Sequence, residues 1–286
     1  MSEVISSPWL SAFKDLITET TSELFLVAPY ITTWPLSWVS EQLTAVNHHS
    51  SKTYLVTDFN VSSLQSGSLN PTALRNFALK SPDTEVFHVP RLHAKVYLND
   101  HTAIITSANL TANGMLHNSE CGVRLNSKTA VAQTRQNVLD YLEIGSPISL
   151  ASLEGIIDCV AELQQTVETR AKGTATTRTL DNLLNWQQEA LTTQVLSSRV
   201  VNESIESIFR RTIIAILQKH GPLSTKMIHE FITQLQPDLC DESVDRIING
   251  VHFGKKWKHQ VRSAQVALKR KNLIGYDAGI WRIKSQ

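Results

Sequence analysis

Cysteine is scarce in this sequence, and long apolar runs are absent. The 286 residues include three cysteines, Cys121, Cys159 and Cys240, with no CxxC pair. This odd number and spacing exclude a disulfide framework and the common zinc modules. No apolar run reaches the roughly 18 residues of a transmembrane helix, and the first ten residues lack a signal-peptide pattern. We therefore expect a soluble protein of the reducing cytoplasm.

The chain also has almost no net charge, since its formal charge is +1. Residues 1–150 carry 9 Lys and Arg against 12 Asp and Glu, and residues 151–250 carry 9 against 13. Residues 251–286, in contrast, carry 9 against 1, a net +8. The C-terminal segment is therefore the part expected to face a polyanion.

Helical and strand-like patterns alternate over the first half of the chain, which predicts an α/β fold. Helical spacing or helix-start signals occur at Pro8–Thr20 and, after the Asn70-Pro71 pair, at Leu69–Leu79. The strand-like runs are Glu23–Ile31, Thr53–Phe59, Glu85–Leu98, Ala103–Ser107 and Ser119–Leu125. We expect residues 1–147 to form a catalytic domain built on a mixed sheet flanked by helices.

The middle of the chain has a different pattern. Apolar residues recur at helical spacing between about 148 and 170, which predicts a long amphipathic helix. Ala171–Thr179 is polar and rich in small residues, as is typical of an exposed connector. We therefore expect residues 148–200 to form a long helix and connector, with a domain boundary between about 171 and 200.

Residues 201–286 predict a separate helical domain. Helices are expected near 205–220, at Ser224–Leu235, at Asp241–Ile248 and at Trp257–Lys271, followed by a hairpin over 273–283. Several helices, a basic helix and a hairpin follow one another in a winged helix-turn-helix, a DNA-binding fold that also serves in protein interactions. The residues expected to contact DNA are Lys255, Lys256, Lys258, His259, Arg262, Gln265, Lys269 and Arg270.

Polar residues recur in pairs along three of the strand-like runs. Because strand side chains alternate between faces, both members of each pair are expected to point the same way. The pairs are His93 and Lys95, Ser107 and Asn109, and Asn118 and Glu120. Adjacent strands would thus collect an imidazole nucleophile, a lysine and an amide that bind phosphoryl oxygens, and a carboxylate that orients the imidazole. Such a set can cleave a phosphodiester without a metal ion or other cofactor.

The residues that carry this pattern also form a known motif. His93-Ala-Lys95-Val-Tyr-Leu-Asn-Asp100 has the spacing HxKxxxxD, and it is followed by Ser107-Ala-Asn109, Gly114 and Asn118-Ser-Glu120. The sequence over roughly residues 10–145 resembles the phospholipase D superfamily. This resemblance implies that His93 forms a covalent phosphohistidine, that Lys95 and Asn109 bind phosphoryl oxygens, and that Glu120 orients the histidine. Ser107 and Asn118 are expected to support the phosphate site, and Asp100 to have a structural role.

Two departures from the pattern of this superfamily affect the prediction. Thr106 stands where many members have glycine, and the HxK spacing occurs once. Because the superfamily's active site uses two histidines, a single motif implies a homodimer with two copies of His93 at the interface. A single motif followed by SxN and a glutamate resembles the bacterial nuclease branch, including metal-independent restriction endonucleases.

The favoured hypothesis is a DNA endonuclease in bacterial restriction or phage defence, acting beside an ATPase, helicase or methyltransferase partner. One alternative is a phospholipase or phosphatidyltransferase, which predicts an apolar or amphipathic membrane-facing segment. Another is a DNA-binding regulator that grips phosphate without catalysis. A zinc site at His88, His93 or Cys121 has spacing that matches none of the usual ligand patterns.

Overall fold

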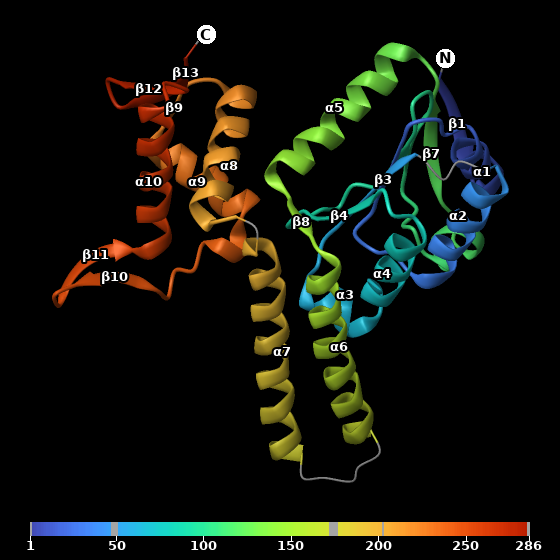
Figure 1. Cartoon of the computed structure of the whole chain (residues 1–286), viewed down its shortest axis with the longest axis horizontal. Helices are drawn as coiled ribbons and strands as arrows, with labels where there is room; N and C mark the ends of the chain where they lie inside the picture. Colours follow the sequence, from blue (N-terminus) through green and yellow to red (C-terminus); the bar gives the residue numbers. More distant parts are fainter. Residues whose placement is uncertain (1, 47–50, 172–176, 202, 285–286) are drawn as a thin grey trace. The chain divides into compact units, whose positions relative to one another are not determined.

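The computed structural model describes residues 2–46, 51–171, 177–201 and 203–284 (Figure 1). The chain divides into two compact units. The first comprises Met1–Leu142 and Pro147–Ser198, and the second comprises Glu143–Ser146 and Arg199–Gln286. Throughout the described ranges, no helix is both long enough and apolar enough to cross a membrane.

An eight-stranded mixed sheet organises the first unit, in the order β1-β7-β6-β5-β2-β3-β4-β8. Strands β2, β3 and β4 are parallel, whereas β1, β7, β6, β5 and β2 pair antiparallel in succession. The predicted α/β fold with a mixed sheet flanked by helices is thereby confirmed. The strands are β1 (Ser2–Ser6), β2 (Glu23–Val27), β3 (Lys52–Thr57), β4 (Thr84–His88), β5 (Val96–Leu98), β6 (Ala103–Thr106), β7 (Cys121–Leu125) and β8 (Ser146–Ile148).

Both faces of this sheet are buried, because its central strands carry apolar side chains on both faces. In β2, Leu24 and Leu26 face one core while Phe25 and Val27 face the other. Helix α5 (Lys128–Ile144) covers the second face through Val131 and Val138. The first face is covered by α1 (Leu10–Thr18), α2 (Thr33–Ala45), α3 (Val61–Ser66), α4 (Pro71–Lys80) and α6 (Leu150–Ala171).

Local signals account for the start of α4. The Asn70 side chain accepts a hydrogen bond from the Ala73 backbone N–H at 3.0 Å, and Pro71 occupies the first turn. Such a cap satisfies an N–H group that has no partner within the helix. The helix predicted from the Asn70-Pro71 pair is therefore confirmed.

Helix α6 is the long amphipathic helix expected between 148 and 170. Its Leu153, Ile156 and Leu163 are fully buried in the core of the first unit. Leu184 and Leu191 of α7 (Thr177–Val200) join the same core. Of the predicted connector, residues 172–176 lie outside the described residues, whereas Ala171 ends α6 and Thr177–Thr179 begin α7. The expectation of a connector was wrong for those four residues.

The second unit contains three long helices and two small sheets (Figure 1). Strand β9 pairs with β13, which pairs with β12. In chain order the elements are α8 (Ile205–His220), β9 (Leu223–Ser224), α9 (Thr225–Leu235), η2 (Pro237–Leu239), β10 (Asp245–Ile248), β11 (Val251–Lys255), α10 (Lys256–Arg270), β12 (Ile274–Asp277) and β13 (Ile280–Ile283).

The helix predicted for Asp241–Ile248 was wrong, because this stretch includes β10 of a β10–β11 hairpin. Asn249 and Gly250 have φ angles of 51° and 79°. Left-handed backbone at both central positions is what a two-residue hairpin turn needs, and Asn-Gly is the favoured pair. The turn and the β-branched residues beside it outweigh the helical spacing.

Candidate active site

The three pairs of polar residues lie at one edge of the sheet, meaning the edge that is formed by the ends of its strands. Each pair flanks a strand: His93 and Lys95 precede β5, Ser107 and Asn109 follow β6, and Asn118 and Glu120 precede β7. Because β5, β6 and β7 are successively antiparallel, these strand ends coincide. The Thr106 N–H donates to the Lys95 carbonyl at 3.1 Å, and the Ser107 N–H donates to the Cys121 carbonyl at 3.0 Å.

The expected placement on the face of three strands was therefore wrong. Glu85–Leu98 is interrupted, because β4 ends at His88 and β5 begins at Val96. Pro90 has no backbone N–H for a ladder, and Arg91 has a left-handed φ of 58°. The turn at these residues separates the two strands and places His93 and Lys95 outside both of them, at the edge, where the His93 side chain is exposed.

His93 and Lys95 contact each other within this edge. The Lys95 Nζ atom donates to the His93 carbonyl at 2.8 Å and lies 3.5 Å from His93 Nε2. The imidazole is exposed, whereas Lys95 is half-buried. Burial lowers the pKa of Lys95, and the nearby negative charge of Glu120 opposes this shift. A lysine beside the ring nitrogen is suited to bind an anion that the nitrogen attacks.

Glu120 is held in position by neighbouring polar groups. Ser107 Oγ donates to one carboxylate oxygen, and Asn118 Nδ2 donates to the other at 3.1 Å. Within the described residues, no hydrogen bond joins Glu120 to His93. The proposed orienting contact between these two residues therefore stays a prediction.

Ser7 also holds Glu120 and Asn118 in position, a role that the sequence did not indicate. Its hydroxyl donates to the Asn118 carbonyl and accepts from the Glu120 N–H, both at 2.8 Å. Ser7 reaches this position because β1 pairs with β7, far away in sequence. The local pattern around Ser7 contains no signal of this role.

The loop that carries Asn109 is held in place by close packing against Gly114. A Cβ atom added to Gly114 would lie 2.5 Å from the Asn109 carbonyl oxygen, so only glycine allows this approach. The Gly114 carbonyl in turn accepts from Trp9 Nε1 at 3.0 Å. Asn109 Oδ1 is buried and has no hydrogen-bond partner among the described residues. An unpaired buried polar atom is costly, and this oxygen, which is an acceptor, calls for a hydrogen-bond donor.

Thr106 stands where many members of the superfamily have glycine, and the paired strand β7 leaves room for its side chain. Thr106 pairs with Gly122, where an added Cβ would lie 2.8 Å from the threonine Cβ. The threonine hydroxyl also donates to the Cys121 carbonyl at 3.1 Å and accepts from the Ala108 N–H at 3.2 Å. Gly122 thus leaves the space that threonine requires.

Asp100 lies at the opposite edge of the sheet, beyond the other end of β5. Its carboxylate accepts hydrogen bonds from the backbone N–H groups of Thr21 and Ser22, at 2.9 and 2.8 Å, and from both hydroxyls. Burial alone would raise the pKa of Asp100, but the hydrogen bonds from Ser22 and Thr21 outweigh it and hold the pKa well below its usual range. These contacts fasten the start of β2 to the β5–β6 turn.

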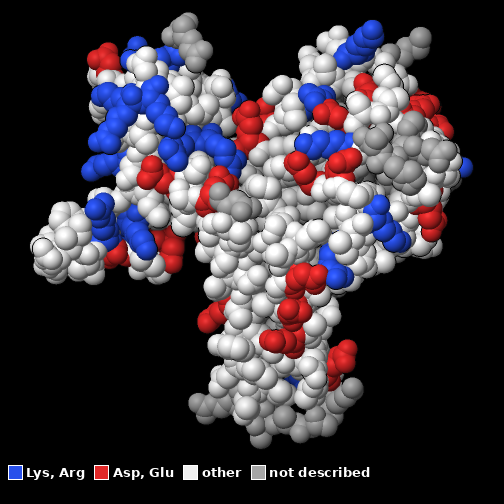
Figure 2. All heavy atoms as spheres, viewed as in Figure 1, with Lys and Arg blue, Asp and Glu red and all other residues white. Residues whose placement is uncertain are grey.

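A basic surface covers α10 of the second unit (Figure 2). Among the residues expected to bind DNA, Lys256, Lys258, Arg262, Lys269 and Arg270 are exposed. Lys255 forms an ion pair with Asp245 at 2.9 Å. Lys258 lies 3.6 Å from Glu242. The exposed side of α10 thus carries cations along its whole length.

One residue expected on this surface is buried, and another takes part in a contact within the second unit. Gln265 is only 2% exposed, because it follows Val261 by one helical turn and lies on the same buried stripe. His259 Nε2 forms a hydrogen bond with the Phe253 carbonyl, so the ring fastens β11 to α10. The prediction that Gln265 faces outward was wrong, and His259 has a structural contact.

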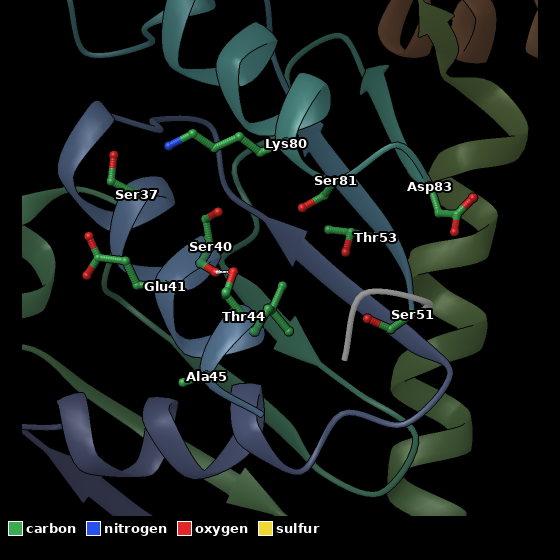
Figure 3. A pocket seen from close by; sticks show the side chains of 11 residues that line it. Ser37, Ser40, Glu41, Thr44, Ala45, Ser51, Thr53, Lys80, Ser81 and Asp83 are labelled. Atoms are coloured by element: carbon green, nitrogen blue, oxygen red, sulfur yellow. Dashed lines mark hydrogen bonds between the residues drawn. The ribbon is translucent and has the colours of Figure 1, made fainter. Parts of the chain in front are cut away.

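A cavity of about 550 Å³ lies away from the candidate site (Figure 3). Its lining includes Thr53 at the start of β3 and Asp83 just before β4, and hence belongs to the opposite edge of the sheet. Residues 37–45 of α2 form another wall. The cavity contributes nothing to the His93 cluster.

Residues 13–141 match the family described as cardiolipin synthase, PLD-like domain. This range includes the whole cluster from His93 to Glu120, and the chain therefore contains a phospholipase D-like domain. Among curated proteins, none matches the chain. In the described part of the chain, no group of three or more His, Cys, Asp and Glu side chains is arranged to hold a metal ion.

The solved structures that the chain matches include proteins from three bacteria. Nuc from Salmonella typhimurium, a phospholipase D family member, is 17% identical, with coverage of 51% of this chain and 97% of that one and a TM-score of 0.43. NucT from Helicobacter pylori is 16% identical, with coverage of 50% and 96% and a TM-score of 0.42. Phosphatidylserine synthase from Haemophilus influenzae Rd KW20 is 14% identical, with coverage of 70% and 47% and a TM-score of 0.45.

Proposed function

We propose that this chain is a metal-independent phosphodiesterase that cleaves DNA through a covalent phosphohistidine on His93. The observation that carries the proposal is the gathering of His93, Lys95, Asn109 and Glu120 at one edge of a phospholipase D-like domain. An exposed imidazole beside a lysine and an amide offers a nucleophile together with groups that stabilise phosphoryl oxygens.

In the proposed reaction, His93 attacks phosphorus, so that a P–N bond forms and the P–O bond to the leaving strand breaks. Lys95 and Asn109 bind the non-bridging oxygens, while Glu120, held by Ser107 and Asn118, stabilises the positive charge on the imidazole. A second histidine protonates the leaving oxygen. Water then attacks phosphorus, the P–N bond breaks, and the proton of water passes to that histidine.

Cleavage should continue when divalent cations are removed. We expect purified protein to cut labelled duplex or single-stranded DNA in excess EDTA at the same rate as in magnesium, because Lys95 and Asn109 take the place of a cation. Product formation over time, assayed on denaturing gels, measures this. Loss of cutting in EDTA with recovery in magnesium would contradict the mechanism.

The second histidine is proposed to be His93 of another copy of the chain, with the two sites meeting in a homodimer. Sedimentation should therefore give twice the mass of one chain. When wild type and His93→Ala chains are co-expressed in equal amounts, activity should fall to about a quarter, because random pairing leaves that share of wild-type dimers. A monomer, or a fall to one half, would contradict a shared site.

For the second unit, we propose a winged helix that binds duplex DNA, with α10 as the DNA-contacting helix and β12–β13 as the wing. The order α8, β9, α9, α10, β12, β13 and the pairing of β9 with β13 support this proposal. So does the row of exposed cations on α10. The biological role we propose is bacterial restriction or phage defence, with a nucleotide-driven partner such as an ATPase or helicase.

Phosphatidyl transfer is the second candidate, because the matching family is described as cardiolipin synthase. The same histidine chemistry would then act on a lipid phosphodiester. Assaying phospholipid vesicles in parallel with DNA separates the two: His93-dependent release of lipid headgroups without DNA cutting would replace the nuclease proposal. A DNA-binding protein without catalysis would be inert towards both substrates.

A further inference from the structure

We infer that the β10–β11 hairpin is a nucleic-acid-binding arm whose apolar end packs against bases of the duplex that α10 holds. The inference rests on the proposed DNA binding by the second unit. It assigns a contact with bases to a segment that precedes α10 directly in the chain, since β11 ends at Lys255 and α10 begins at Lys256.

The end of the hairpin is unusually apolar for an exposed structure. Ile248 and Val251 are directly paired across the strands, and Phe253 follows two residues later on the same face. Their exposed fractions are 43%, 55% and 49%. A two-stranded ribbon with an uncovered apolar face is at best marginally stable in water, so this face is expected to have a partner.

The charges around this face indicate what kind of partner it takes. Asp245, the carboxylate of β10, is already engaged by Lys255 at 2.9 Å and by His252 at 3.7 Å. Helix α10 contains no acidic residue, and the two carboxylates that precede β10 are both engaged, Asp241 by Ser243 and Glu242 by Lys258. The exposed cations of α10 therefore lie next to the apolar end of the hairpin. This combination is complementary to a polyanion with an apolar interior.

A groove with basic residues on both sides lies between the hairpin and α10. This groove of about 420 Å³ is lined by Asp245, Arg246 and Ile247 of the hairpin and by Lys256, His259 and Ser263 of the helix, among others, and the Asp245 carboxylate is paired with Lys255. The hydrogen bond between His259 and the Phe253 carbonyl fixes the hairpin against the helix beside this groove. A sugar-phosphate strand bound there would have cations on both sides.

The end of the arm would contact the bases and not the phosphates. No Lys or Arg occurs between Ile247 and Gly254, so the end offers no phosphate contact of its own. Proteins that bend DNA from the minor groove insert apolar side chains between base steps and thereby kink the duplex. The apolar end of the hairpin is suited to the same contact.

Binding and bending of a labelled duplex test the arm. In the full-length chain carrying His93→Ala to prevent cutting, we expect Val251→Ser with Phe253→Ser to weaken binding tenfold or more. The bend, measured by energy transfer between dyes at the duplex ends, should disappear. The salt dependence of binding should not change, because no cation is lost. Lys258→Ala with Arg262→Ala should instead reduce the salt slope by about two.

Two further variants separate base contact from misfolding of the hairpin. Val251→Thr keeps the β-branched shape and should weaken binding to a smaller extent, and Val4→Ser, an 81% exposed valine of the first unit, should have no effect. Unchanged binding and bending in Val251→Ser with Phe253→Ser would overturn the inference while DNA binding stands. A change of oligomeric state in that variant would also overturn it, in favour of an interface between copies. A parent protein that binds no duplex would remove the proposed DNA binding itself.

Discussion

Replacing His93 by alanine should reduce phosphodiester cleavage by about 10⁴-fold or more, because the proposed covalent intermediate cannot form without the imidazole. The imidazole is exposed at the sheet edge, so the melting temperature should not change. Single-turnover cleavage of labelled DNA in EDTA measures the loss. With wild type, the labelled DNA should be found attached to the protein after an alkaline quench. The label should be released in acid, because a P–N bond to histidine is stable in alkali and hydrolyses in acid.

The matched control is His101→Ala. His101 is also exposed, and it lies in the β5–β6 turn at the opposite edge of the sheet. We expect full activity from this variant. If His93→Ala retained activity within tenfold of wild type, or if both histidine variants lost activity alike, the nucleophile assignment would have to be abandoned.

Asp100→Asn should destabilise the first unit by about 3 kcal/mol, because the Asp100 carboxylate accepts hydrogen bonds from two backbone N–H groups and two hydroxyls at the start of β2. The molecules that remain folded should cleave at the wild-type rate, since Asp100 lies at the edge opposite His93. Chemical denaturation and the rate per folded molecule measure the two effects separately.

The same variant should alter the response to acid. The folded-state pKa of Asp100 is held below the unfolded value of 3.8, so its carboxylate contributes its full stabilisation above that value. This contribution is lost as the pH falls through the folded pKa. The stability difference between wild type and Asp100→Asn should therefore be largest near neutrality and shrink below about pH 4. Asp83→Asn, which changes an exposed carboxylate of the same unit, should show neither effect.

A fully stable but inactive Asp100→Asn protein would contradict this assignment. In that case the aspartate of the HxKxxxxD motif would act in catalysis, and the hydrogen bonds to Thr21 and Ser22 would be incidental. A difference in stability that grows towards low pH would contradict the depressed pKa.

Features that depend on neighbours along the chain followed from the sequence. The Asn70-Pro71 pair predicted the start of α4, and apolar spacing predicted the long helix that became α6. Local capping and helical periodicity are decided within a few residues, so a linear pattern contains them. The HxKxxxxD spacing likewise marked a phospholipase D-like domain, and the charge count located the basic surface of α10.

Other features were decided only by the tertiary structure. The pairing of β1 with β7 brings Ser7 to Glu120, and the antiparallel pairing of β5, β6 and β7 brings His93, Asn109 and Glu120 to the same edge of the sheet. Gln265 is buried because α10 packs on that stripe. Each of these outcomes depends on contacts between residues that are distant along the chain. The sequence by itself therefore determined which groups are available for chemistry, whereas long-range strand pairing and helix packing determined where those groups meet.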